Sequence, residues 1–273
     1  MPDGSRAGTA VHWRRLGRGT APVLFLHCAL AHSGAWKGVA ERLSDRIDAV
    51  APDMPGHGRS ADWDGTGDLH DVVTGIAGSF LDDGSLGTPV HLVGHSFGGT
   101  VALRLAEAHP DRVASLTLVE PVLFAAARGH APEAFAGHVA EFGPIRAAFD
   151  AGRREEAARI FTTLWGDPAR GWDDLSAAQR AALGAGMAYV LATDGALMED
   201  SRGLLAPGRP EAVTAPTLLI RGAETRPVVA GIHAGLEARL PNAREVVVPQ
   251  AGHMVPITHP DAVAGALSGQ IPG

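Results

Sequence analysis

Cysteine is almost absent from this sequence. The 273-residue chain contains one, Cys28, so it cannot form an intrachain disulfide and lacks the paired cysteines of structural zinc sites. A reducing compartment is compatible with this composition. Cys28 ends a predicted buried strand and has no evident activating base, so we expect a small core residue rather than a reactive thiol.

Basic clusters and long apolar runs are also missing. The formal net charge is −7, and no basic cluster is longer than the arginine pair in "GRREEAAR", which is followed directly by Glu155 and Glu156. These features argue against nucleic acid or an anionic membrane as a partner. No apolar stretch approaches the ~20 residues that span a bilayer, and the first residues lack the apolar core of a secretory signal. We therefore expect a cytoplasmic protein.

The sequence does contain enough apolar material for a large core, because 45% of its residues are hydrophobic and 19% are charged. Helical patterns separate most of the short apolar runs that predict strands. This alternation predicts an α/β fold with a mostly parallel sheet flanked by helices and with ligands at the carboxyl ends of the strands. The predicted strands are "TAVHWRRLG", "APVLFLHC", "IDAVAPDMP", "PVHLVGHS", "RVASLTLVEP", "APTLLIRG" and "AREVVVPQAGH".

A long helical stretch interrupts the alternation. Between about residues 122 and 209 the β-rich runs stop, and segments such as "SAAQRAALGAGMAYVLATDG" favour helices. We predict one core formed by residues 1–121 and 210–273, with residues 122–209 inserted as a helical lid. Apolar side chains of the lid are candidates for lining a substrate pocket, and packing of the lid on itself is the alternative. The candidate pocket residues are Phe124, Trp165, Met187, Tyr189 and, outside the lid, Met254.

The stretch "VGHSFGGTV", residues 93–101, carries the strongest chemical signal. The run "PVHLVG" before Ser96 predicts a buried strand, and the apolar spacing after it predicts a helix. On the tight turn between them, a side chain at Gly94 or Gly98 would collide with neighbouring backbone. The pattern G-x-S-x-G on such a turn is typical of a nucleophile elbow, which exposes a serine hydroxyl for attack.

Four stretches together resemble the α/β-hydrolase superfamily: "LHCALAHSGAW", "DMPGHGRS", "VGHSFGG" and "AGHMVPITHP". The resemblance implies the α/β-hydrolase fold, a lid after the sixth strand and a triad in the chain order nucleophile, acid, histidine. Serine at the elbow separates the chain from the haloalkane dehalogenases and epoxide hydrolases of this fold, which attack with a carboxylate. The chain is therefore similar to the esterase-like branch with a serine nucleophile, whose expected intermediate is an acyl-enzyme.

Thirteen histidines compete for the role of catalytic base. His253 follows the last predicted strand, and similar superfamily members carry their catalytic histidine in this "GH" context. A serine hydroxyl is a poor nucleophile at neutral pH, so it needs this base and a carboxylate that orients the base. His57 and Asp53 in "APDMPGHGRS" match a family turn that serves structure. His27 is expected to brace the oxyanion loop, and His95 points away from its neighbour Ser96.

Two glutamates compete for the role of triad acid. In most relatives the acid comes three residues after the glycine that ends the next-to-last strand; here that position is Thr225, and threonine cannot serve. Glu224 is one residue earlier and is the alternative acid, although it is equally consistent with an exposed loop charge. Glu120 ends the strand "VASLTLVE", where some relatives carry their acid, and a charge after so apolar a run needs a partner. We favour Glu120, whose competing interpretation is a hinge residue bonded to backbone amides.

Acyl transfer also needs donors for the developing oxyanion. In the superfamily these are the N–H of the residue after the nucleophile and one N–H on the loop after the third strand. The resemblance places them at Phe97 and Ala29. Cys28 stands where relatives usually have glycine, which leaves Leu30 as an alternative second donor.

Together these residues predict a cofactor-independent serine hydrolase with no metal site. The expected substrate is a small-molecule ester or lactone of apolar character, because the predicted lid offers few charged anchors. Two alternatives remain: a carbon–carbon bond hydrolase that acts on a diketone with the same triad, and a ligand receptor built on the hydrolase scaffold. The sequence carries no signal for the oligomeric state.

Overall fold

A twisted sheet of seven strands forms the centre of the protein, which a computed structural model describes over residues 3–272. The sheet order is β3-β5-β4-β6-β7-β8-β9, and all neighbours are parallel except β3, which runs antiparallel to β5. The prediction of a mostly parallel sheet is therefore confirmed. The strands are β3 (Trp13–Leu16), β4 (Ala21–Leu26), β5 (Ile47–Pro52), β6 (Val90–His95), β7 (Val113–Val119), β8 (Thr217–Gly222) and β9 (Ala243–Val248), beside a separate ribbon of β1 (Gly4–Arg6) and β2 (Thr9–Val11).

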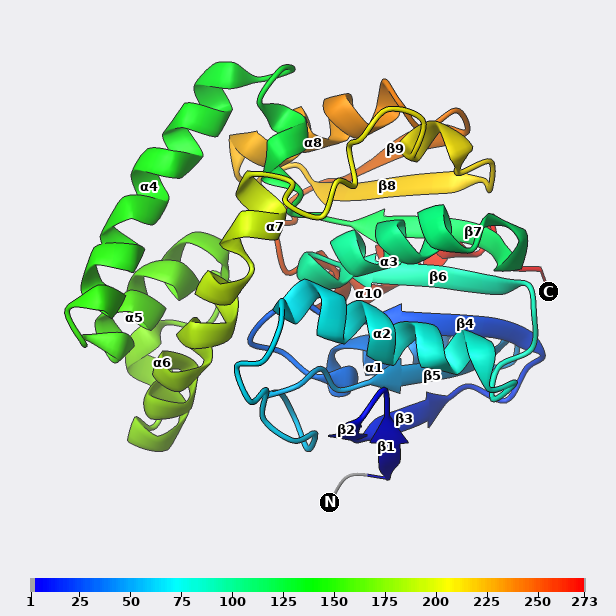
Figure 1. The fold of residues 1–273 in the computed structure, drawn as a ribbon, viewed down its shortest axis with the longest axis horizontal. Helices are drawn as coiled ribbons and strands as arrows, with labels where there is room; N and C mark the ends of the chain where they lie inside the picture. The colour runs from blue at the N-terminus through cyan, green and yellow to red at the C-terminus, as the bar shows by residue number, and fades with distance from the viewer. Residues whose placement is uncertain (1–2, 273) are drawn as a thin grey trace.

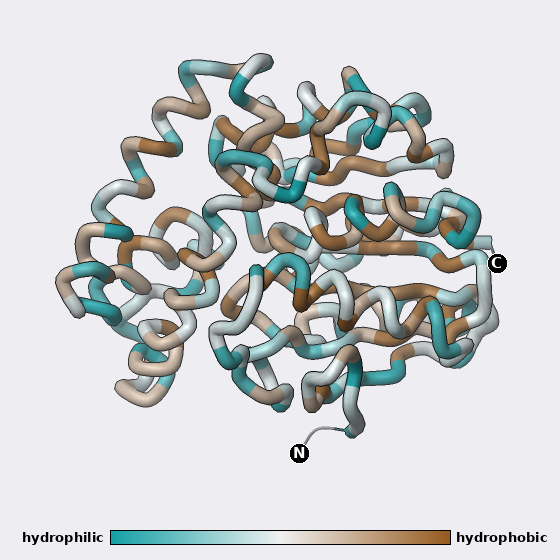
Figure 2. The backbone as a smooth tube through the Cα atoms, viewed as in Figure 1, coloured by the Kyte–Doolittle hydropathy of each residue, from teal (hydrophilic) through white to brown (hydrophobic). Residues whose placement is uncertain are grey.

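Helices cover both faces of the sheet (Figure 1). Successive side chains of a strand point to opposite faces, and β4 shows the result: Leu24 and Leu26 join one buried cluster, whereas Val23 and Phe25 join the other. The first cluster packs against α2 (Leu69–Asp82), α3 (Phe97–Ala108) and α8 (Pro227–Glu237), and the second against α1 (Lys37–Arg42), α9 (Val255–Thr258) and α10 (Pro260–Leu267). In Figure 2 the most hydrophobic stretches of backbone follow the central strands.

All the elements between β7 and β8 are helical, and α4, α5 and α6 stand beside one end of the sheet (Figure 1). They are η3 (Phe124–Ala127), α4 (Pro132–Asp150), α5 (Arg154–Trp165), η4 (Trp172–Asp174), α6 (Ala177–Ala192), α7 (Asp194–Met198) and η5 (Pro210–Ala212). Helices α4, α5 and α6 share a small core of their own around Ile145 and Met187. Short 3-10 helices η1 (Ser33–Trp36) and η2 (Pro110–Arg112) complete the chain.

Local sequence explains where several helices begin. The Asp68 carboxylate accepts hydrogen bonds from the first N–H groups of α2, and Ser176 forms a capping box with Gln179 at the start of α6. Proline occupies the first position of α4, α8 and α10, where its missing N–H costs nothing. Within residues 3–272, none of the helices is both long and apolar enough to cross a bilayer.

Candidate active site

Ser96 sits at the sharp turn from β6 into α3. Its backbone has φ 55° and ψ −119°, a strained combination for a residue with a side chain. The two nearby glycines make this turn possible: a Cβ at Gly94 would lie 2.2 Å from the carbonyl oxygen of Gly98, and one at Gly98 would lie 2.3 Å from that of Leu26. The close approach predicted for both glycines is thus present in the structure.

Leu30 and Glu120 also have positive φ, at 61° and 50°. Both lie at the end of the sheet where Ser96 lies, since Leu30 follows β4 and Glu120 follows β7. A non-glycine residue keeps a positive φ only when the surrounding structure holds it there, and residues with such backbone strain are concentrated at functional sites.

A cavity of about 40 Å³ opens beside Ser96. Ala29 of the loop after β4, Phe97 beside Ser96, and His253 of the loop after β9 line it. Residues of the helical segment form the rest of its wall, so four separate parts of the chain meet there. Apart from Ser96 and His253, its walls are mainly apolar, with Thr193 and Asp194 as polar exceptions. The further wall residues come from the segment after β7: Val122, Phe124, Phe142, Phe161, Trp165, Val190, Asp194 and Leu197.

The His253 ring contacts Glu120 directly. Its Nδ1 lies 3.0 Å from Glu120 Oε2, and both side chains are buried. The same Oε2 accepts the hydroxyl hydrogen of Thr225 at 2.6 Å, and Oε1 accepts the N–H of Gly222 at 2.7 Å. The carboxylate is therefore compensated by three donors, as a buried charge requires.

Glu224 lies in a different environment. It is exposed, and its N–H bonds the Ala251 carbonyl at 2.9 Å, which ties down the turn after β8. It borders an outer hollow that also touches His253. Of the two candidate acids, only Glu120 is hydrogen-bonded to the His253 ring.

His95 supports His253 from behind. Its Nε2 lies 2.8 Å from the His253 carbonyl oxygen, and a carbonyl can only accept, so the His95 proton is on Nε2. Complete burial holds the pKa of His95 well below its ordinary value. The rings of the two histidines lie 5.1 Å apart, and the edge of Trp165 packs on His253 with centroids 4.8 Å apart. This contact was not predicted from the sequence, in which His95 is placed only relative to its neighbour Ser96.

The loop after β4 is held by two neutral histidines. His57 Nε2 accepts the N–H of Leu30 at 3.0 Å, and His27 Nε2 accepts the N–H of Met54 at 2.9 Å. The Nδ1–H of His57 donates to the Pro55 carbonyl at 2.8 Å, and the Nδ1–H of His27 donates to the Cys28 carbonyl at 2.8 Å. Burial lowers the pKa of His57 and lowers that of His27 to about 3, so both rings keep accepting these N–H groups at neutral pH.

This arrangement removes Leu30 as a candidate oxyanion donor, because its N–H is already used by His57. Ala29 and Phe97 both border the cavity. Phe97 is the first residue of α3, and the first N–H groups of a helix have no partner within the helix.

Two other polar groups near the site have structural surroundings. Asp53 is buried and accepts the N–H groups of Ser33 at 2.7 Å and Arg59 at 2.9 Å, which closes the turn that carries His57. Cys28 is buried, and burial raises the pKa of its thiol to about 12, so it stays protonated.

Three of the predicted pocket residues do not line the cavity beside Ser96. Met187 is completely buried in the small core of the helical segment, where it packs between helices instead of facing the cavity. Tyr189 packs against the His57 ring and lies 3.2 Å from the Asp62 carboxylate. Met254 borders the outer hollow instead. Phe124 and Trp165 do line the cavity, whereas helical spacing alone did not single out Phe142 or the other wall residues.

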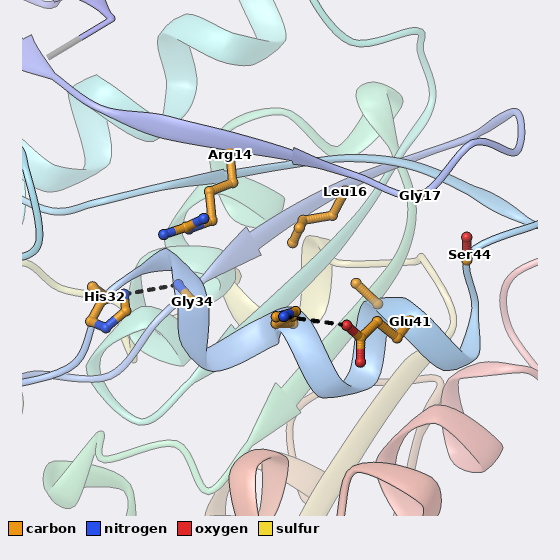
Figure 3. Close-up of a pocket in the computed structure, with 9 residues that line it drawn as sticks. Arg14, Leu16, Gly17, His32, Gly34, Glu41 and Ser44 are labelled. Atoms are coloured by element: carbon orange, nitrogen blue, oxygen red, sulfur yellow. Dashed lines mark hydrogen bonds and ion pairs between the residues drawn. The ribbon is translucent and has the colours of Figure 1, made fainter. Parts of the chain in front are cut away.

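A larger hollow of about 490 Å³ lies between β3 and α1, away from these residues (Figure 3). Arg14, His32 and Glu41 border it, and Lys37 pairs with Glu41 across a turn of α1. None of the predicted site residues borders this hollow. Between residues 3 and 272, no three His, Cys, Asp or Glu side chains are grouped so that they could hold a metal ion.

The fold and the elbow geometry define a class, that of the α/β hydrolases. A family model described as "Alpha/beta hydrolase family" matches residues 23–266, which is most of the sequence. The chain belongs to this family.

Named relatives differ in how much of the chain they match. The chain is 42% identical over 114 residues to Lipase LipV of Mycobacterium tuberculosis, covering 41% of this chain and 42% of that protein. It is 28% identical over 264 residues to the pimeloyl-[acyl-carrier protein] methyl ester esterase of Nitrosomonas europaea, covering 92% and 96%. It spans only 31% to 42% of the length of the first three relatives.

Among solved structures, the haloalkane dehalogenase DatA from Agrobacterium tumefaciens superposes with a TM-score of 0.72 and 20% identity, covering 98% of this chain and 94% of that one. At this identity the likeness concerns the fold alone.

Proposed function

We propose that this protein is a cofactor-independent serine hydrolase that cleaves a carboxylic ester or lactone through an acyl-enzyme intermediate. The observation that carries the proposal is the 3.0 Å contact between His253 Nδ1 and the buried Glu120 carboxylate, at a cavity that His253 shares with Ser96. The esterase from Nitrosomonas europaea, which matches over nearly the whole chain, supports an ester as substrate.

The first half-reaction transfers the acyl group to the enzyme. Ser96 Oγ attacks the substrate carbonyl carbon while His253 Nε2 accepts the hydroxyl proton, and the contact with Glu120 keeps the other ring proton on Nδ1. The negative charge that develops on the carbonyl oxygen is stabilised by the N–H groups of Phe97 and Ala29. When the tetrahedral intermediate collapses, the bond to the alcohol oxygen breaks and that oxygen takes the proton from His253.

The second half-reaction uses water. His253 takes a proton from a water molecule, the resulting hydroxide attacks the acyl carbon, and the bond to Ser96 Oγ breaks as the serine recovers its proton. The products are the acid and free Ser96. For a lactone, the alcohol and the acid remain in one molecule.

Residues 122–209 act in this proposal as a lid over the core formed by residues 1–121 and 210–273. Trp165 and Phe124 from this segment contribute to the cavity wall and shield the ester from bulk water. Shielding strengthens the interaction between the oxyanion and its donors, because the local dielectric constant is low.

The test is labelling of the folded protein with a fluorophosphonate, followed by peptide mapping, together with turnover of p-nitrophenyl acetate. We expect label on Ser96, loss of label in Ser96→Ala, and a fall in kcat of at least about 10⁴-fold in that variant. Ser115→Ala is the matched control, since Ser115 is a buried serine outside the cavity. Activity unchanged in Ser96→Ala, or label on another residue, would refute the proposal; dialysis against EDTA should leave turnover unchanged.

A further inference from the structure

Two spaces meet at His253. The inner one is the cavity of about 40 Å³ that also touches Ser96. The outer one is a hollow of about 450 Å³ between the turn after β8, with Glu224 and Arg226, and the segment after α5, with Asp167. Among the residues that the structure describes, His253 alone borders both.

The inner cavity has room for only a few heavy atoms of a substrate. A water molecule needs about 10–15 Å³ of such volume, so the cavity holds roughly three groups of that size. Its wall is built from Phe142 of α4, Phe161 of α5 and Leu197 of α7, three helices that pack against one another or against the core. Because protein interiors are close-packed, a longer chain would have to displace these side chains.

A half-buried carboxyl group also borders the inner cavity. Asp194 lies in its wall and pairs with Arg146 of α4. Burial raises the pKa of Asp194 above its ordinary value, because its charged form is poorly solvated. A second carboxylate placed beside it would be disfavoured by both desolvation and like-charge repulsion.

The chemistry of ester cleavage decides which part of a substrate enters which space. Ala29 and Phe97, the proposed oxyanion donors, border the inner cavity, so the carbonyl group lies there. The alcohol oxygen must reach the His253 ring to receive its proton, and His253 also borders the outer hollow. The acyl chain is then directed inward and the alcohol outward.

On the basis of the proposed serine hydrolase function, we propose that the preferred substrates are esters of a short, uncharged acid, about two to four carbons long, with a larger, polar alcohol. The inner cavity is the acyl pocket. The outer hollow receives the alcohol, and Arg226, Asp167 and His259 on its border provide polar contacts.

The first experiment measures kcat/KM of the full chain for p-nitrophenyl acetate, butyrate, octanoate and monosuccinate. We expect octanoate to be at least about 100-fold poorer than butyrate, since each surplus methylene that a closed pocket rejects costs about 10-fold or more. We also expect the charged monosuccinate to be at least about 10-fold poorer than the uncharged butyrate, because of repulsion by Asp194. Butyrates of methanol and of triethylene glycol monomethyl ether, followed by pH-stat, test the alcohol side, and the larger alcohol should be accepted at least as well.

Variants connect these ratios to the cavity. Phe142→Ala should raise the octanoate-to-butyrate ratio at least about 10-fold by removing part of the wall, and Leu197→Ala is a second route if Phe142→Ala does not fold. Phe149→Ala is the matched control: Phe149 is a half-buried phenylalanine two turns further along α4 that does not border the cavity. Asp194→Asn should raise the ratio of kcat/KM for monosuccinate to that for butyrate. The variant removes the repelling carboxylate and leaves the Arg146 guanidinium free to attract the carboxylate of the substrate.

The outcomes separate this inference from the function on which it rests. Equal or better turnover of octanoate by the wild type, with activity still dependent on Ser96, overturns the acyl-pocket assignment and leaves the hydrolase intact. Tolerance of long acids combined with rejection of the larger alcohol reverses the proposed orientation and overturns it as well. Failure of Ser96 to take up a fluorophosphonate overturns the hydrolase and the acyl pocket together.

Discussion

Thr225 donates its hydroxyl hydrogen to Oε2 of Glu120 at 2.6 Å, the same oxygen that lies 3.0 Å from His253 Nδ1. The resemblance to the α/β hydrolases predicts the triad acid at the position of Thr225. In this chain the side chain at that position supports a carboxylate contributed by another strand. The two side chains meet although 105 positions of chain separate them.

The first prediction concerns this carboxylate. Glu120→Gln should lower kcat for p-nitrophenyl acetate by about 10⁴-fold, because an amide can hold the His253 ring in the wrong tautomer. Glu224→Gln is the matched control and should stay within about threefold of the wild type, since its side chain is exposed. The opposite ranking of the two variants would assign the acid to Glu224.

Thr225 itself should act as a positioning residue. Thr225→Val removes one hydrogen bond to Glu120 and should lower kcat by about 10- to 100-fold, the equivalent of one hydrogen bond to a charged group. Thr225→Ser retains the hydroxyl and should restore most of the rate. KM should change little in either variant. If serine rescues no better than valine, the hydroxyl is not what matters at this position.

His95 should also affect kcat more than KM. His95→Leu removes the donor to the His253 carbonyl, and the resulting shift of the ring should cost about 100-fold in kcat. His95→Gln keeps an N–H at a comparable reach and should recover part of the loss. Circular dichroism and the melting temperature Tm check that both variants are folded. Equal losses in the two folded variants would argue against a positioning role.

Gly98 should tolerate no side chain. A Cβ there would lie 2.3 Å from the Leu26 carbonyl oxygen and 2.6 Å from that of His27, and backbone cannot yield easily at a sheet. Gly98→Ala should destabilise the protein by about 3 kcal/mol or more and lower Tm accordingly. Gly137→Ala in α4 is the control: a Cβ there meets nothing within 4 Å, so the variant should be slightly stabilised by about 0.5–1 kcal/mol. An unchanged Tm for Gly98→Ala would contradict the elbow geometry.

Glu107 on α3 should make stability depend on pH. Burial raises its pKa to about 8 even though Arg209 Nη2 lies 3.0 Å away. The folded state therefore holds a proton that the unfolded state has released, so this contribution is complete below the ordinary carboxyl pKa and is lost as the pH rises through about 8. Tm of the wild type should fall between pH 5 and 9 relative to that of Glu107→Gln, which cannot titrate. Parallel Tm profiles of the two proteins would refute this.

Much of the fold can be predicted from the sequence, because the patterns that specify strands, helix ends and turns lie within short stretches of chain. Each predicted strand corresponds to an observed one, with "TAVHWRRLG" divided between β2 and β3. The apolar runs are long enough for strands, and the caps and prolines stop and start the helices within a few residues. Gly94 likewise meets backbone only four residues further along, at Gly98, so the turn could be predicted from "VGHSFGG", whereas the contact of Gly98 with the Leu26 carbonyl depends on a distant strand.

The sequence by itself determined the α/β-hydrolase fold and the turn that carries Ser96, and it predicted His253, among thirteen histidines, as the catalytic base through its place after the last strand. Tertiary structure alone decided that Glu120 meets His253 across 133 positions of chain, that the N–H of Leu30 is taken by His57, and that Met187 packs inside the helical segment. The physical reason is the distance along the chain over which each interaction acts. Periodicity and turn chemistry act between neighbours in the chain, whereas the partner of a buried charge or N–H is set by how distant segments pack.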